Sequence, residues 1–213
     1  MINTDLKINS LIIDLQYIPT ISWLLNSIKY KNIKINIFEQ SQKRSFRNKC
    51  YVVGSNGLIC LTIPLVGGRD NKQKVKDIRI NNNYKWQLLH WKTIESCYKK
   101  SPYYDYFEQV FKPFYQNQYE YLFDFNLKLT NLVLSTCKLD SQIEIVDDSF
   151  NKQDVIDMRY AITPQNYNEQ NQYSYSQVFQ EKIGFYPNVC CLDLFMNDAL
   201  HFKENNLFLR HQQ

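Results

Sequence analysis

A short segment, Lys43-Arg44-Ser45-Phe46-Arg47-Asn48-Lys49-Cys50, combines residue types that could bind an anion. It holds four cations, an amide and an aromatic ring within eight residues. The planar guanidinium of arginine matches a phosphate or a carboxylate, and lysine supplies a point charge. We therefore expect Lys43, Arg44 and Arg47 to hold an anionic ligand and Asn48 to orient it. A solvated edge of mixed charge is the alternative interpretation of the same residues.

Two apolar stretches flank this segment and indicate what positions it. Upstream, residues 33–39 alternate apolar and polar side chains, which is the period of a half-buried strand. Downstream, residues 58–64 form an apolar run rich in β-branched residues that ends at a proline, as a core strand does. The basic residues therefore lie on a predicted loop between core strands, where binding groups are common.

The same reasoning extends to the rest of the chain. Strands are predicted at residues 8–15, 33–39, 50–54, 58–63 and 76–80, with a hairpin turn at Ser55-Asn56-Gly57. Apolar spacings of three and four predict helices at residues 21–28, 86–98, 104–111, 122–133 and 174–183, and a final helix or strand at 189–195. The opening is thus a β-α-β unit, which joins parallel strands. We predict a single α/β domain over residues 1–213, with a mixed sheet from the N-terminal half packed by helices mostly from the C-terminal half.

His90 is a candidate acid or base on the predicted helix 86–98. Its helix face also carries Trp86 and Ile94. An imidazole titrates near neutral pH, at about 6.5, and this suits proton transfer. The alternative is a buried histidine whose hydrogen bonds are satisfied in the core.

Glu95 and Tyr98 follow on the same helix and could form a polar rim to a pocket that His90 opens onto. Glu95 would then be catalytic with His90, and Tyr98 would bind substrate. The alternative is that Glu95 pairs with Lys99 across one helical turn.

The basic segment also resembles the K-[RQT]-[ST]-[FYW]-x-N-[RK] signature of the WbqC-like family. The resemblance continues in the same order and spacing through nearly the whole chain, at Leu61-Thr62-Ile63-Pro64-Leu65, Val75-Lys76-Asp77-Ile78-Arg79-Ile80, Trp86, His90-Trp91-Lys92-Thr93-Ile94-Glu95-Ser96-Cys97-Tyr98, Ser101-Pro102-Tyr103-Tyr104, Phe123-Asp124-Phe125-Asn126, Tyr175-Ser176-Gln177-Val178-Phe179 and Gly184-Phe185-Tyr186-Pro187-Asn188. The chain is identified as a member of this family, whose genes lie near bacterial surface-polysaccharide genes such as O-antigen clusters.

One segment departs from the family pattern. Many members open with His-Gln-Pro-x-x-x-Pro after the first strand, whereas this chain has Asp14-Leu15-Gln16-Tyr17-Ile18-Pro19. Gln16 and Pro19 are kept and the histidine is missing, as in the variant common in Bacteroidetes-type members. The resemblance implies that Gln16 contributes to substrate binding, and any role of the missing histidine does not carry over.

Composition narrows the function classes. The net charge of +4 is too small for a general nucleic-acid binder, and no apolar run reaches the roughly 20 residues that span a bilayer. The start of the chain lacks a secretion signal, so a cytoplasmic protein without membrane insertion is expected. Six scattered cysteines without a CxxC pair predict free thiols and no metal site. No sequence motif points to a cofactor, and the oligomeric state is left open.

Two functions remain at this stage. The first is an enzyme of surface-polysaccharide biosynthesis, a transferase that moves an acyl or aminoacyl group to an amino-sugar nucleotide. The second is a non-catalytic protein that binds a nucleotide-sugar or a partner in the same pathway. The expected partner is an anionic small molecule such as a nucleotide-sugar, and the sequence alone does not decide whether the protein is an enzyme.

Overall fold

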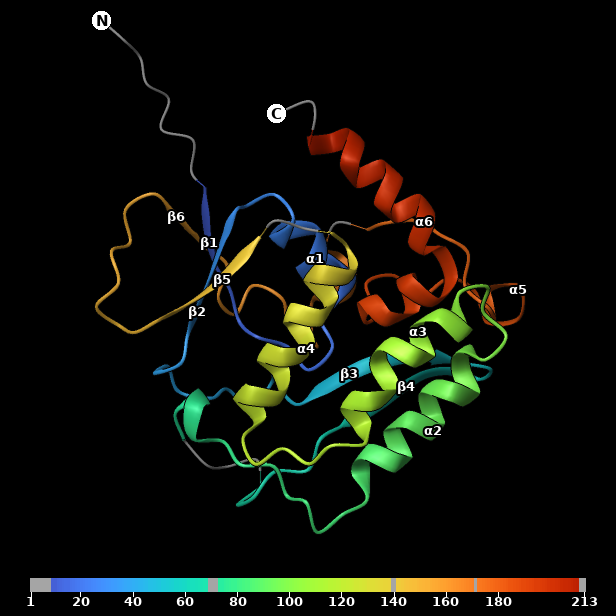
Figure 1. The fold of residues 1–213 in the computed structure, drawn as a ribbon, viewed down its shortest axis with the longest axis horizontal. Coiled ribbons are helices and arrows are strands. Elements are labelled where there is room, and N and C mark those ends of the chain that lie inside the picture. Colours follow the sequence, from blue (N-terminus) through green and yellow to red (C-terminus); the bar gives the residue numbers. More distant parts are fainter. Residues whose placement is uncertain (1–8, 69–72, 139–140, 171, 211–213) are drawn as a thin grey trace, which may run out of the picture.

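The computed structural model describes residues 9–68, 73–138, 141–170 and 172–210 (Figure 1). Its first layer is a parallel sheet of four strands in the order β5-β2-β1-β6. The strands are β1 (Ser10–Ile12), β2 (Asn32–Asn36), β5 (Gln142–Val146) and β6 (Val155–Asp157). Because all of them run in the same direction, their carboxyl ends meet at one edge of the sheet.

Helix α1 (Ile21–Ser27) connects β1 to β2 and completes the predicted β-α-β start. The helix begins at Thr20, whose side-chain oxygen accepts a hydrogen bond from the backbone N–H of Trp23 at 3.2 Å. Its apolar residues Ile21, Trp23 and Leu24 are fully buried. Apolar spacing at Ile21, Leu24, Leu25 and Ile28 predicted the helix, whose buried face also includes Trp23, while Leu25 and Ile28 are partly buried.

The second sheet is an antiparallel hairpin of β3 (Lys49–Gly54) and β4 (Gly57–Thr62). The turn lies at Ser55 and Asn56, as predicted, and Gly57 follows it with a φ of 118°, a conformation that favours glycine. This hairpin begins directly at the end of the basic segment.

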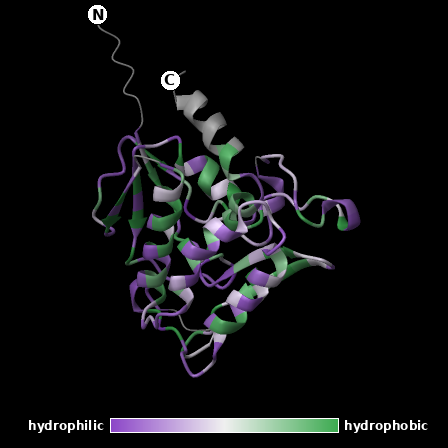
Figure 2. Ribbon diagram, turned by 45° about the vertical axis from the view of Figure 1, so that its right-hand side comes forward, coloured by the Kyte–Doolittle hydropathy of each residue, from purple (hydrophilic) through white to green (hydrophobic). Residues whose placement is uncertain are grey.

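Six α-helices are present in the described ranges, and five of them follow residue 85: α2 (Trp86–Tyr98), α3 (Tyr104–Phe111), α4 (Leu122–Thr136), α5 (Gln180–Ile183) and α6 (Cys191–Arg210), which is kinked at Asp198. Short 3-10 helices lie at Val75–Asp77, Lys112–Tyr115 and Tyr167–Glu169. Helices α2 and α3 carry hydrophilic and hydrophobic residues side by side along their length, as helices that cover a core on one side do (Figure 2). No helix among these residues combines the length and apolar character needed to cross a bilayer.

The predicted α/β class is confirmed, and the details of the sheets differ in two ways. The strands form two separate sheets, and β5 and β6 come from the C-terminal half of the chain. The strand predicted at residues 76–80 is largely absent. The N–H groups of Val75 and Lys76 donate to the carbonyls of Glu39 and Ile37, so this segment covers the loop after β2 and keeps only isolated bridges at Arg79 and Ile80.

The helix predicted at residues 174–183 is also shorter than expected and covers only Gln180–Ile183. The side chains of Tyr175 and Gln177 explain the difference, because both hydrogen-bond the buried carboxylate of Asp193 in α6. These inward contacts hold the segment before α5 in a non-helical path. The predicted stop at Gly184 is confirmed, with a φ of 81°.

Candidate functional site

Three side chains from different strands converge at the carboxyl edge of the parallel sheet. Asp14 lies two residues after β1, Glu39 lies three residues after β2, and Tyr160 lies three residues after β6. Strand β1 is flanked by β2 on one side and by β6 on the other, so the connections diverge around it. In open parallel sheets, ligands bind outside the carboxyl ends of the strands at such a point.

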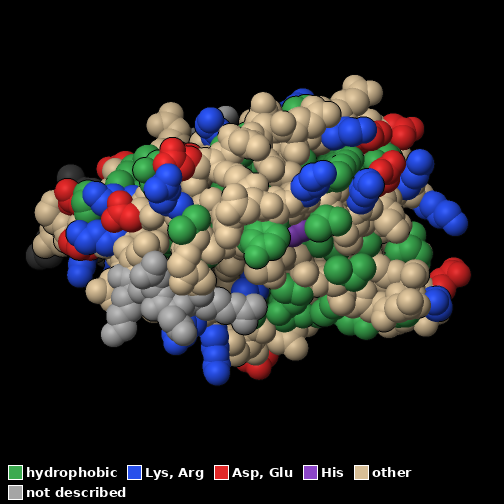
Figure 3. All heavy atoms as spheres, turned by 90° about the horizontal axis from the view of Figure 1, so that it is seen from below, with side chains coloured by type: hydrophobic (Ala, Val, Ile, Leu, Met, Phe, Trp, Pro, Cys, Tyr) green, Lys and Arg blue, Asp and Glu red, His purple; other side chains and the backbone are tan. Residues whose placement is uncertain are grey.

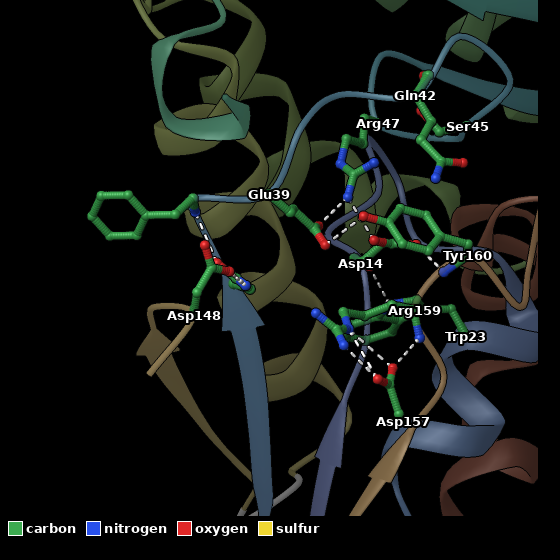
Figure 4. Close-up of polar contacts among 12 residues, drawn as sticks. Asp14, Trp23, Glu39, Gln42, Ser45, Arg47, Asp148, Asp157, Arg159 and Tyr160 are labelled. Carbon is green, nitrogen blue, oxygen red and sulfur yellow. Dashed lines mark hydrogen bonds and ion pairs between the residues drawn. The ribbon is translucent and has the colours of Figure 1, made fainter. Parts of the chain in front are cut away.

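Arg47 joins these residues from the basic loop, which we define as residues 43–49. It is 3% exposed, and its Nη2 donates to Oδ1 of Asp14 at 2.5 Å and to Oε1 of Glu39. Tyr160 donates its backbone N–H to Oδ2 of Asp14 at 2.6 Å and its hydroxyl to Oε2 of Glu39 at 2.8 Å. The four side chains point toward one another and form the Arg47 cluster (Figure 4).

The charges of the Arg47 cluster do not cancel when both carboxyl groups are ionised. Burial raises the pKa of Glu39 to about 7; Asp14 adds to the rise, and the opposing effect of Arg47 does not cancel it. Burial and the hydrogen bond to Glu39 raise the pKa of Tyr160 to about 12. A carboxyl group that titrates near neutral pH beside specific charged partners is typical of a functional site.

Tyr160 is held in an uncommon backbone conformation, with a φ of 62°. A tyrosine in the left-handed region is disfavoured by about 1 kcal/mol or more, and such residues cluster at functional sites. The two hydrogen bonds to Asp14 and Glu39 fix this conformation. Backbone strain and perturbed titration therefore coincide in the same cluster.

Neighbouring contacts fix the rest of this sheet edge. Asn36 at the end of β2 donates to Oδ1 of Asp148 at 2.7 Å, which ties the loops after β2 and β5 together. Arg159 donates from Nη2 to Oδ2 of Asp157 at 2.5 Å (Figure 4). The edge is therefore lined by charged groups of both signs.

Arg47 also faces a pocket formed by the basic loop. The pocket is small, with a cavity volume of about 40 Å³, and its lining includes Gln42, Lys43, Ser45, Arg47, Asn48, Leu65, Ile78 and Leu122. While Nη2 of Arg47 binds the two carboxylates, its Nε and Nη1 are buried and have no hydrogen-bond partner in the described part of the chain. A residue that lines the pocket thus has two buried donors without an acceptor among the described residues.

Three anchors hold the basic loop in place. Phe46 is buried, and its carbonyl accepts a hydrogen bond from the N–H of Tyr17 at 2.9 Å. The amide of Asn48 donates to the carbonyl of Ile63 at 3.0 Å. Asn126 on α4 donates to the carbonyl of Arg47 at 2.7 Å. These contacts fix the backbone of the basic loop, while the side chains of Lys43 and Arg44 at its start are exposed.

The residues of this loop that were predicted to bind substrate differ in how exposed they are. Lys43 and Arg44 are exposed, Asn48 is half-buried at the pocket, and Arg47 is buried below it. Gln16 is also buried, and its Oε1 accepts a hydrogen bond from the N–H of Thr20 at 2.8 Å. The side-chain oxygen of Gln16 thus satisfies a backbone N–H of the segment that leads into α1.

His90 lies in the core between α2 and the segment after β1. Its Nδ1 is 2.9 Å from the hydroxyl of Tyr17, its ring packs edge-on against Trp86, and it also bonds the backbone of Thr62. Burial lowers the pKa of His90 to about 4. A histidine is visible between hydrophobic side chains on one face of the molecule (Figure 3). These partners of His90 are Tyr17, Trp86 and Thr62, and Lys43, Arg44 and Arg47 are not among them.

Glu95 and Tyr98 lie apart from the Arg47 cluster as well. Glu95 is 3.6 Å from Nζ of Lys99, the helical pairing considered as its alternative role. The hydroxyl of Tyr98 is buried and accepts a hydrogen bond from the N–H of Val53 in the hairpin at 3.1 Å. The structure thus brings together Lys43, Arg47 and Asn48, and it places His90, Glu95 and Tyr98 elsewhere.

Sequence reasoning did not single out Asp14, Glu39 or Tyr160. A signal existed for the two acids, because each lies at the carboxyl end of a predicted strand of the β-α-β start and parallel strands end at the same edge. Tyr160 follows β6, which has only three residues and was not predicted. Across the described ranges, no group of three or more His, Cys, Asp or Glu side chains is arranged to hold a metal ion.

Comparison with known proteins shows to which family the chain belongs. A model described as the WbqC-like protein family matches residues 38–165. This chain belongs to the WbqC-like family. The match covers Glu39, the basic loop and Tyr160, and Asp14 precedes it. No curated protein and no solved structure matches the chain. Membership of the WbqC-like family suggests a polysaccharide-related role, and the Bacteroidetes-type variant stays a prediction.

Proposed function

We propose that this WbqC-like protein binds the anionic part of a nucleotide-sugar at the basic loop, as a component of surface-polysaccharide biosynthesis. The observation that carries the proposal is the state of Arg47. Its side chain is buried at the wall of a pocket, and two of its donor atoms lack an acceptor among the described residues. Buried polar groups are almost always hydrogen-bonded, so a ligand acceptor at this place is the expected complement.

The energetics favour an anion over a neutral ligand. Leaving a buried donor unsatisfied costs about 1–3 kcal/mol, and hydrogen bonds between ionised partners are stronger than neutral ones. Lys43 lines the same pocket and Arg44 follows it in the chain; both are exposed and add attraction for an approaching anion. A diphosphate supplies several acceptor oxygens to such a set, and the apolar lining from Leu65, Ile78 and Leu122 suits the less polar parts of a ligand.

A second candidate is a transferase that moves an acyl or aminoacyl group to an amino-sugar nucleotide. The observation that favours it is the Asp14–Glu39 pair, since a carboxyl group with a pKa of about 7 suits a general base at neutral pH. His90 suits this role less well, because its pKa is about 4 and its Nδ1 is taken up by Tyr17. We therefore propose Glu39 as the base in this candidate.

A thermal-shift experiment tests the binding function. The protein is heated with sulfate and with nucleoside-diphosphate sugars, and the same is done for the double variant Lys43→Ala/Arg44→Ala. The matched control is Lys29→Ala/Lys31→Ala, which removes the same charge from two exposed positions between α1 and β2. A ligand at 100 times its dissociation constant stabilises by about 2.7 kcal/mol, which is a rise of roughly 5–10 °C for a chain of this size.

We expect the parent and the control to be stabilised and the Lys43/Arg44 variant to lose most of the rise. An equal response of all three proteins would contradict the proposal. For the transferase candidate, the parent and Glu39→Gln are incubated with an acyl thioester and a nucleoside-diphosphate amino-sugar, and the acylated product is sought by mass spectrometry. Product from the parent but not from Glu39→Gln supports this candidate, and equal product from both argues against Glu39 as the base.

A further inference from the structure

The Arg47 cluster contains an odd number of buried charges. Asp14 and Glu39 both accept a hydrogen bond from the same nitrogen, Nη2 of Arg47, and their side chains are only 11% and 8% exposed. Because both carboxyl groups contact the same nitrogen, their oxygens lie close together, and a proton on one of them relieves the repulsion between the pair. One guanidinium cannot neutralise two ionised carboxylates, and like charges at this distance resist simultaneous ionisation.

We infer that anion binding at the basic-loop pocket is coupled to the uptake of one proton by the Asp14–Glu39 pair. The inference deepens the proposed function and rests on it, because it concerns the same pocket. It predicts a property that anion binding alone does not require. The protein takes up its ligand together with a proton, and its affinity falls as the pair loses that proton.

The coupling follows from the position of Arg47 between the carboxyl pair and the pocket. Its Nη2 donates to both carboxylates, and the same residue lines the pocket, while its Nε and Nη1 are buried without an acceptor among the described residues. When both acids are ionised, they outweigh the charge of the guanidinium and repel an incoming anion. When the pair holds a proton, one carboxylate neutralises Arg47 and that repulsion is removed. By reciprocity, a bound anion makes the proton harder to remove.

The groups that face Glu39 determine which side chain gains or loses a proton near neutral pH. They are Arg47 from the basic loop, Asp14 after β1, and Tyr160 and Arg159 after β6. Tyr160, with a pKa of about 12, keeps its proton at neutral pH, and arginines stay charged. The pKa of Glu39 is about 7, so the change in charge falls within the physiological range. His90, with a pKa of about 4, does not titrate there.

Calorimetric titration measures the coupling directly. The probes are sulfate and a nucleoside-diphosphate sugar, since the charge of each is constant from about pH 6 to about pH 8.5. Repeating the titration in buffers of different ionisation enthalpy counts the protons taken up. We expect a fractional uptake that is largest at slightly alkaline pH, about half a proton per ligand if the pKa of Glu39 rises by one unit, and weaker binding at about pH 8.5 than at about pH 6. A rise of one unit in the pKa of Glu39 on binding corresponds to about a tenfold difference in affinity.

The variant Glu39→Gln mimics the protonated carboxyl group. It should bind both probes with the same affinity at both pH values, at least as tightly as the parent at low pH, and without proton uptake. The control His201→Gln/His211→Gln removes the two other imidazoles of the chain and should behave as the parent does. If Glu39→Gln does not fold, the proton count of the parent still decides the question.

The outcomes separate the two proposals. Binding without proton uptake, or uptake that persists in a folded Glu39→Gln protein, would overturn the coupling and leave the proposed function standing. Failure of both probes to bind at any pH would overturn the proposed function itself.

Discussion

The hydroxyl oxygen of Tyr17 lies 2.9 Å from Nδ1 of His90, and this contact fixes the imidazole in the interior. Tyr17 also donates its hydroxyl to that of Tyr115 at 2.9 Å, and its backbone N–H bonds the carbonyl of Phe46. His90 is thus one member of a buried polar chain that links α2 to the segment after β1. These contacts indicate a structural contribution that can be measured separately from ligand binding.

His90 is expected to make the fold sensitive to acid. Its pKa is lowered from 6.5 to about 4 by burial, so below pH 6.5 the unfolded chain takes up a proton that the folded protein does not. The stability gained from neutral His90 is therefore present above pH 6.5 and declines by about 3 kcal/mol as the pH falls to about 4. Urea unfolding of the parent and His90→Gln should show a difference that shrinks over this range. Glu39 contributes in the opposite direction but equally in both proteins, so a constant difference would refute the assignment.

Arg47 should matter far more for stability than Arg44. Arg47→Met leaves two buried carboxylates without their cation, which typically costs about 3–5 kcal/mol. The same substitution at exposed Arg44 should change stability by less than about 0.5 kcal/mol. Chemical denaturation at about pH 8 measures both, and the loss in Arg47→Met should be smaller at about pH 5, where Glu39 is protonated. Similar losses for the two variants would show that the Arg47 cluster does not hold the fold together.

Tyr160 is expected to set the titration of Glu39. Its hydroxyl donates to Oε2 of Glu39 and thereby lowers the pKa of that carboxyl group, against the larger effect of burial. Tyr160→Phe removes this donor and should raise the pKa of Glu39 above its value of about 7 in the parent. Carbon-13 NMR titration follows the carboxyl group, with Glu39→Gln to assign the signal. An unchanged or lowered pKa in Tyr160→Phe would disprove the role of this hydrogen bond.

The cysteines should differ sharply in reactivity. All six are free thiols, of which Cys60 on β4 is exposed and the other five are buried. Burial raises the pKa of the Cys50, Cys97 and Cys191 thiols, which lowers their thiolate content further. Thiol titration should find one fast-reacting group in the native protein and six in denaturant. Loss of the fast phase in Cys60→Ser would assign it, and its persistence would not fit the structure.

Local periodicity predicted the elements whose partners are close in sequence. The helices at α1 and α2 and the β3–β4 hairpin follow from apolar spacing and from the Asn56-Gly57 turn. Strands β5 and β6 were not predicted, because β5 is mostly exposed and β6 has three residues. Their places beside β2 and β1 depend on pairing over long separations, which a local pattern does not encode.

The candidate site was predicted only in part, because its residues also come together through pairing of strands that are distant in sequence. Arg47 was predicted to bind substrate together with Lys43 and Arg44, and in the structure it lines a pocket with Lys43. Its burial against Asp14 and Glu39 was not foreseen, since the order of the strands is needed to see that these acids meet. His90 and Glu95 were selected for their chemistry on one helix, and their tertiary contacts separate them from the basic loop.

The three anchors of the basic loop have a kinetic consequence. Phe46, Asn48 and the carbonyl of Arg47 are each fixed by the surrounding fold, so the backbone that frames the pocket is already ordered. A preorganised receptor loses little conformational entropy on association, and most of the entropic loss then belongs to the ligand. Complex formation should therefore proceed in a single kinetic phase whose rate is set by encounter and ionic strength, without a slower rearrangement of the loop.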